Sequence, residues 1–128
     1  MRVERIKQRV PEVVSNGIVE RWADAIMFEG LVSVHPHVGI RGQWTVTLAQ
    51  SGWGVLHLDS EREAVICATS LLRQLGPQLG FRHPDSSAPS AKDRIKAFVA
   101  AWGAERIKHG FGRGAEVLLW GPDGNKLR

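Results

Sequence analysis

The chain of 128 residues contains a single cysteine, Cys67, and no tyrosine. One cysteine excludes a disulfide within the chain, so a packed apolar core has to stabilise the fold. No apolar run approaches the roughly 20 residues of a membrane-spanning helix, which excludes that class of membrane protein. The charged residues near the N-terminus also leave no room for the hydrophobic region of a signal peptide, and we therefore expect a cytoplasmic location.

Motifs for covalent catalysis and for phosphate binding are also missing. The chain has no Gly-x-Ser-x-Gly sequence, and its one cysteine lies in a helical apolar stripe, where we expect a small buried side chain. Gly110, Gly112 and Gly114 follow a predicted helix and precede a predicted strand, which is the reverse of the order in a phosphate-binding loop. We therefore expect a module that is not an enzyme and that carries no cofactor.

The positive charge is concentrated in the last third of the chain. Acidic and basic residues balance up to residue 90, whereas residues 91–128 hold eight bases and four acids. A basic surface localised in this way attracts phosphates or an acidic protein, although it is also compatible with a solubilising surface. The candidate basic contacts are Lys92, Arg94, Lys96, Arg106, Lys108 and Arg113.

Residues 44–58 have the pattern of two strands joined by a tight turn. Trp44, Val46 and Leu48 alternate with threonines, which is the two-residue period of a strand with one buried face. Ser51-Gly52 can supply the positive φ of a short hairpin. We therefore predict strands over residues 44–49 and 53–58.

A helix is predicted directly after this hairpin. Ser60 and Glu63 have the spacing of a capping box, in which the Ser60 hydroxyl accepts from the Glu63 amide and the Glu63 carboxylate reaches back to the Ser60 amide. Gly76-Pro77 ends the apolar stripe that follows. Because a hairpin alone is marginal in water, we expect the helix to cover its apolar face.

The whole chain of residues 1–128 is expected to form one domain. Apolar residues at helical spacing predict a helical N-terminal segment over residues 1–30, as one helix or two. Residues 31–76 are assigned a strand, the hairpin and the capped helix, residues 77–90 a loop, and residues 91–128 a helix with a terminal hairpin. The predicted fold class is α+β, with a mainly antiparallel sheet of four to five strands and helices on one face.

Several local motifs resemble those of a family of very small bacterial domains of unknown function. They are the tryptophan-bearing hairpin, the Asp-Ser-x-x-Glu-Ala helix start at residues 59–64, and the Gly-x-Asp-Gly turn within residues 115–128. The resemblance implies a helix covering a three- or four-stranded meander. It implies no activity, and this chain departs from the family pattern by an added N-terminal segment, a long loop and an extra helix.

Three histidines are candidate metal ligands. His35 and His37 lie two residues apart and would share a face of a strand, and His57 lies on the predicted hairpin. No acidic residue or cysteine nearby completes the set, and Pro36 interrupts regular strand geometry. Exposed or hydrogen-bonded histidines are therefore the alternative, and a small enzyme or small-ligand site at these residues is a minority hypothesis.

The leading hypothesis is a binding or accessory module that recognises a protein partner or a second copy of itself. Trp53 and Trp120 flank turns and are candidate partner anchors, while Trp22, Trp44 and Trp102 fit core stripes. Nucleic-acid binding through the basic C-terminal third is the second hypothesis, and no membrane contact is expected.

Overall fold

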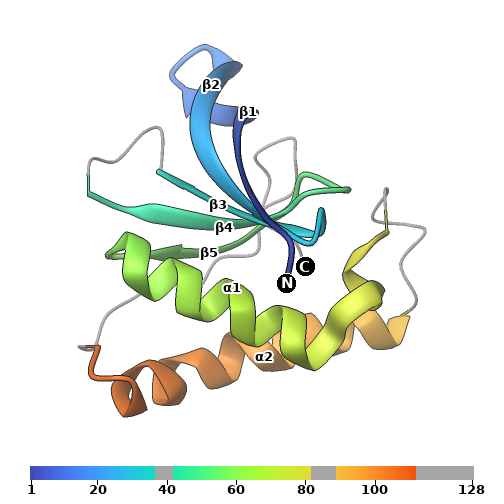
Figure 1. Cartoon of the computed structure of the whole chain (residues 1–128). Coiled ribbons are helices and arrows are strands. Elements are labelled where there is room, and N and C mark those ends of the chain that lie inside the picture. The colour runs from blue at the N-terminus through green and yellow to red at the C-terminus, as the bar shows by residue number, and fades with distance from the viewer. Residues whose placement is uncertain (37–41, 82–88, 112–128) are drawn as a thin grey trace.

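The computed structural model describes residues 1–36, 42–81 and 89–111 as a five-stranded antiparallel sheet with two helices on one of its faces (Figure 1). The strands lie in sequence order, and the predicted α+β class is confirmed. The predicted terminal hairpin within residues 115–128 lies outside the described residues. The elements are β1 (Val3–Val14), β2 (Gly17–Phe28), β3 (Val32–Pro36), β4 (Trp44–Leu48), β5 (Gly54–Leu58), α1 (Glu61–Leu75), the 3-10 turn η1 (Gly76–Leu79) and α2 (Pro89–Lys108).

The main core lies between the sheet and the helices. Strands β3, β4 and β5 turn alternate apolar residues towards α1, as the alternation at Trp44, Val46 and Leu48 predicts. A β-bulge at Val55 places this residue in the core beside Leu56, which follows it in the strand. The predicted hairpin is thus confirmed as β4 and β5, with Gly52 at φ 79° in its turn.

The N-terminal segment is the main error of the sequence analysis. Residues 1–30, predicted to be helical, form a β-hairpin whose two strands pair over twelve positions, from Val3↔Phe28 to Val14↔Gly17. Neither one helix nor two is present there. Valine and isoleucine are frequent in this segment, and such β-branched residues favour strands. The turn at residues 15–16 is followed by Gly17 at φ 130°, a conformation that favours glycine.

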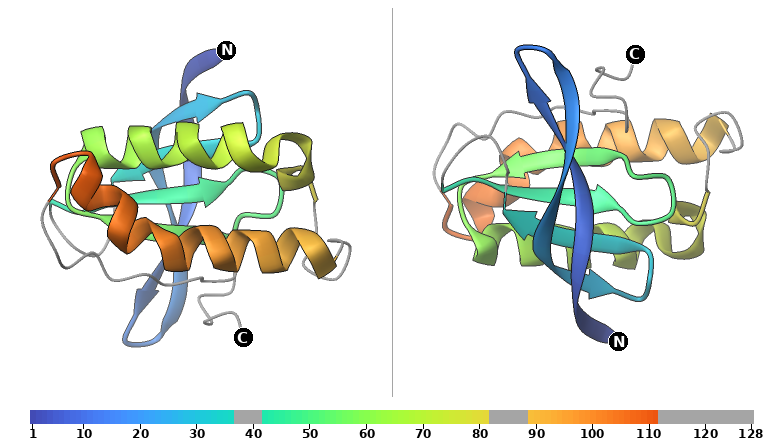
Figure 2. Two further views of the ribbon diagram at one scale, coloured as in Figure 1. Left: turned by 90° about the horizontal axis from the view of Figure 1, so that it is seen from below. Right: turned by 90° about the horizontal axis from the view of Figure 1, so that it is seen from above.

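The hairpin of β1 and β2, called the arm below, pairs with the rest of the sheet at its base. β2 pairs with β3 at three positions, from Ile26↔Val34 to Phe28↔Val32. The rest of the arm crosses the sheet on the side away from the helices (Figure 2). A strand of twelve residues is about 40 Å long, whereas the five-residue strands β3, β4 and β5 are about 17 Å long. The arm therefore extends beyond the sheet.

Helix α1 begins as the sequence predicts. The Ser60 hydroxyl accepts a hydrogen bond from the Glu63 amide at 3.1 Å, and Gly76 ends the helix at φ 51°. The Glu63 carboxylate differs from the prediction, because it binds the guanidinium of Arg106 on α2 in place of the Ser60 amide. Among the described residues, neither helix has the length and apolar character needed to cross a bilayer.

Helix α2 is held against α1 by a buried ion pair. Arg106 Nε lies 2.9 Å from Glu63 Oε1, and both side chains are at most 3 % exposed. The hydrogen bond to Glu63 raises the pKa of Arg106 above its ordinary value, so the guanidinium stays charged. Asp59 adds a second acceptor at 3.3 Å. The pair fixes the C-terminal end of α2, and Phe98 and Trp102 of the same helix lie in the core.

Breaking this ion pair from one side is expected to destabilise the protein strongly. Arg106→Met leaves the Glu63 charge buried without its partner, which should lower the free energy of unfolding by about 3–5 kcal/mol. The double variant Glu63→Leu/Arg106→Met removes both charges and should lose far less. Lys108→Met, which breaks an exposed pair with Glu105, is the control and should cost at most about 1 kcal/mol. Urea unfolding measures all three, and a double variant no more stable than Arg106→Met would contradict this account.

Candidate functional site

The second face of the sheet, opposite the helices, carries a strip of polar side chains. His35, Thr45 and His57 stand side by side on β3, β4 and β5, and Thr47 lies beside them. His35 Nδ1 donates to the Pro36 carbonyl at 3.0 Å, and its Nε2 lies 2.8 Å from the Thr47 hydroxyl. The Thr45 hydroxyl bonds His57 Nδ1 at 3.0 Å. These hydrogen bonds compensate for burying polar groups in the sheet.

The structure does not bring the candidate metal ligands together. His35 and His57 are separated by the strand that carries Thr45, so their backbones lie about 10 Å apart at two strand spacings. Both rings are also engaged in hydrogen bonds, His35 Nε2 with the Thr47 hydroxyl and His57 Nδ1 with the Thr45 hydroxyl. His37 lies outside the described residues. Within the described part of the chain, no group of three potential metal ligands converges.

The bond between His35 and Thr47 gives a test of the polar strip. Thr47→Val keeps the shape of the side chain but removes the hydroxyl that bonds His35 Nε2, so the free energy of unfolding should fall by about 1 kcal/mol. Thr47→Ser keeps the hydroxyl and should retain the hydrogen bond. Chemical denaturation of both variants checks this expectation. A loss of stability in Thr47→Ser together with none in Thr47→Val would show that the methyl group, not the hydrogen bond, matters.

Cys67 lies in α1 with its side chain fully buried, as expected. Burial, together with the negative charge of Glu63, raises the pKa of the Cys67 thiol well above its ordinary value. The thiolate is the reactive form of cysteine, and the thiol therefore stays protonated and inert at neutral pH.

This shift predicts a pH-dependent contribution to stability. The unfolded state loses its thiol proton near pH 8.5, before the folded state does, so the free energy of unfolding falls as the pH rises above about 8.5. Cys67→Ala lacks this contribution. The stability of the wild type relative to Cys67→Ala should therefore decrease between about pH 8 and pH 10, by up to about 1.4 kcal/mol per pH unit. Urea titrations across this range measure the difference, and a constant difference would contradict the prediction.

The candidate basic residues on α2 do not form one surface. Arg106 is buried, and the prediction of an exposed contact there is wrong. The Lys92 ammonium lies 5.6 Å from the centre of the Trp53 ring, and Lys108 pairs with Glu105. Lys96 is exposed on this helix, and Arg113 lies outside the described residues.

Of the two tryptophans proposed as anchors, Trp53 is a core residue. It is 3 % exposed and meets Phe81 edge-on, with 5.2 Å between the ring centres. The prediction that Trp53 anchors a partner is therefore wrong, because its ring is buried in the core, with Phe81 at its edge and the Lys92 ammonium over it. Trp120 lies outside the described residues.

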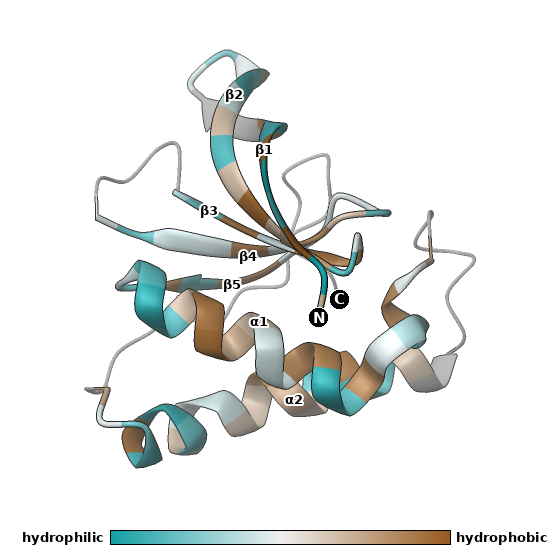
Figure 3. Ribbon diagram, viewed as in Figure 1, coloured by the Kyte–Doolittle hydropathy of each residue, from teal (hydrophilic) through white to brown (hydrophobic). Residues whose placement is uncertain are grey.

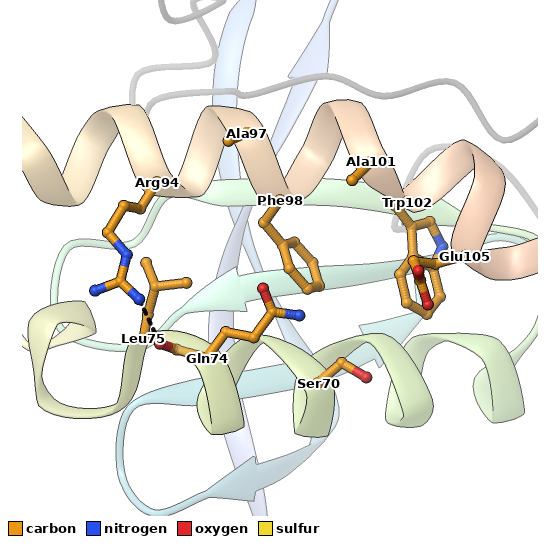
Figure 4. Close-up of a pocket in the computed structure, with 9 residues that line it drawn as sticks. All are labelled: Ser70, Gln74, Leu75, Arg94, Ala97, Phe98, Ala101, Trp102 and Glu105. Atoms are coloured by element: carbon orange, nitrogen blue, oxygen red, sulfur yellow. Dashed lines mark hydrogen bonds between the residues drawn. The ribbon is translucent and has the colours of Figure 1, made fainter.

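A groove of about 400 Å³ runs between α1 and α2 (Figure 4). Its floor includes Leu75 and Phe98, and Arg94 and Glu105 stand towards its opposite ends. The Arg94 guanidinium is already engaged, because it donates to the Gln74 carbonyl at 2.7 Å. The groove therefore offers an apolar floor with one charge of each sign, and no cluster of catalytic groups.

The arm presents the most exposed aromatic surface among the described residues. Cross-strand pairing places Arg9 beside Trp22 and Lys7 beside Asp24 on one face of the arm. Trp22 is 68 % exposed, and the Arg9 guanidinium lies 5.8 Å from the centre of its ring. The outer face of the arm is defined here as Arg5, Lys7, Arg9, Glu20, Trp22 and Asp24.

The two strands of the arm carry opposite charges on this outer face. All three cations belong to β1, and both carboxylates belong to β2. Lys7 pairs with Asp24 and Arg9 pairs with Glu20, each at 2.5 Å. On the opposite face of the arm, Val10 and Ala25 are buried, whereas Val19 and Arg21 further along β2 are exposed. The base of β2, next to the sheet, is hydrophobic, and bands of hydrophilic residues follow further along the strand (Figure 3).

Sequence reasoning missed Trp22 because it assigned the residue to the buried stripe of a helix. The signal that could have corrected this is Asn16-Gly17, a dipeptide typical of hairpin turns, between segments rich in valine and isoleucine. In a strand, Trp22 shares a face with charged residues. That pattern predicts an exposed side chain.

No protein-family model, curated protein or solved structure matches the chain. The resemblance to very small bacterial domains stays a prediction.

Proposed function

We propose that this protein is a protein-binding module and that the outer face of the arm is its contact surface. The observation that supports this most directly is Trp22, a large aromatic side chain 68 % exposed at the centre of that face. Tryptophan and arginine dominate the energetics of protein interfaces, and here Arg9 lies over the Trp22 ring.

The length of the arm supports the same proposal. A two-stranded hairpin is marginally stable in water, and beyond its three-residue junction with β3 the arm continues for nine more residues of β2. Cross-strand ion pairs at Lys7 and Arg9 help to hold it, but exposed pairs contribute at most about 1 kcal/mol each. A bound partner would stabilise the arm further by burying Trp22.

A protein fits the outer face better than a nucleic acid does. Glu20 and Asp24 lie beside the cations on this face, and carboxylates repel phosphates. The basic residues of α2 are dispersed, with Arg106 buried and Lys108 paired. Nucleic-acid binding through the C-terminal third therefore stays a prediction that these contacts do not strengthen.

Site-specific photocrosslinking tests the proposal. A photoreactive phenylalanine derivative replaces Trp22 in one variant and Ile107 in a matched control, since Ile107 is a large apolar residue of α2 that is 51 % exposed. In a cell extract, the variant at position 22 should form discrete protein adducts that the variant at position 107 does not form. Excess wild-type protein should either suppress the adducts to other proteins or become the crosslinked species itself, whereas excess Trp22→Ala protein should do neither.

Two results would contradict the proposal. The first is the absence of adducts at position 22. The second is an identical adduct pattern from both positions, because it would show non-specific contact.

A further inference from the structure

The distribution of charge on the arm indicates what the arm binds. On its outer face, β1 carries Arg5, Lys7 and Arg9, and β2 carries Glu20 and Asp24, with Trp22 between the two acids. This surface has a row of cations beside a parallel row of anions. It is complementary to a second copy of itself when the cationic row of each copy faces the anionic row of the other copy. Self-complementarity is the requirement for an interface around a two-fold axis.

We propose that the partner is a second copy of this chain, with the outer faces of two arms packed against each other. This inference rests on the proposed function of the arm. A two-fold axis running along the arms places β1 of one copy over β2 of the other at the same level. Lys7 of each copy then faces Asp24 of the other, and each Arg9 faces the other Trp22.

The alternative two-fold arrangement is excluded by charge. An axis running across the arms would place β1 over β1 and β2 over β2. Arginine and lysine rows would then oppose each other, which costs free energy wherever like charges meet. Of these two arrangements, the one along the arms brings opposite charges together, so the charge pattern favours that geometry.

The ion pairs within each arm are compatible with this interface. Lys7 and Asp24 are already 2.5 Å apart in one chain, and their side chains are 71 % and 81 % exposed. When a second copy binds, the Lys7–Asp24 pairs of the two chains form one network of four charges. The two Trp22 side chains are buried beside this network. The gain in charge interaction is screened by salt, because the Debye length is about 10 Å at 0.1 M ionic strength.

The size of the arm sets the affinity range. Two strands of about 40 Å form a face about 10 Å wide, or roughly 400 Å² in projection. This value lies below the roughly 800 Å² that each partner buries in a standard interface, so we expect a weak, reversible dimer. Association should therefore be measured up to several hundred micromolar.

A charge exchange between two chains tests the arrangement. Lys7→Glu places acids on both strands, and Asp24→Lys places cations on both. Each variant alone should dimerise at least about tenfold more weakly than the wild type. In an equimolar mixture, Glu introduced at position 7 faces Lys introduced at position 24, and the unchanged Lys7 faces the unchanged Asp24. The mixture should form a heterodimer with an affinity within about threefold of the wild-type dimer.

The mixture separates contacts between chains from effects within a chain. Each variant keeps its own like-charge pair in the mixture, so recovered association has to come from the partner. Sedimentation velocity measures the dissociation constants of the full-length proteins, and native mass spectrometry distinguishes the heterodimer from homodimers. Circular dichroism confirms that both variants are folded. Trp22→Ala should weaken the wild-type dimer at least about tenfold, whereas Ile107→Ala should leave it unchanged.

The outcomes also separate this inference from the proposed function. A wild-type chain that stays monomeric at several hundred micromolar, together with specific adducts at position 22, would overturn the second-copy partner but keep the arm as a binding surface. A dimer that is insensitive to Trp22→Ala, or a mixture that associates no better than its components, would overturn the arm-to-arm arrangement.

Discussion

Three residue pairs between β2 and β3 connect the arm to the body of the protein, and the arrangement of the molecule depends on them. Phe28, at the end of β2, is 4 % exposed and belongs to the core beneath the sheet. Glu29 and Gly30 follow with φ of 55° and 64°, and the Glu29 amide donates to the Arg2 carbonyl at 2.8 Å. This tight junction fixes the base of the arm. Pairing between β2 and β3 stops at Ile26↔Val34, so among the described residues the outer part of β2 pairs with β1 alone.

The sequence predicted those elements whose signals are local. Alternation identified β4, and the spacing of Ser60 and Glu63 located the start of α1, because both patterns report contacts between residues close in the chain. The N-terminal segment was assigned wrongly since its apolar residues match a helical spacing as well as a strand. The choice depends on pairing over twelve positions, and periodicity in one segment does not report pairing with another.

The candidate site was less predictable than the fold. Arg106 belongs to a basic segment, yet it is buried against Glu63, which lies 43 residues earlier in the chain. Trp53 adjoins a turn but is buried, with the Phe81 ring packed edge-on against it. Whether a charge or an aromatic ring is exposed depends on how distant segments pack. Trp22 could have been recognised only after its segment was assigned to a strand.

Pro11 explains why a partner would bind the outer face of the arm and would not add a strand along the edge of β1. It lies in β1, the edge strand of the sheet, opposite Glu20 of β2. Proline has no amide hydrogen, so a further strand added along β1 would find no donor at this position, and edge strands commonly carry proline and lysine for this reason. The neighbouring Arg9 and Lys7 also disfavour such addition. These three residues of β1 thus disfavour pairing with the edge strand of another chain. The side chains of the outer face, including Trp22, remain accessible to a partner.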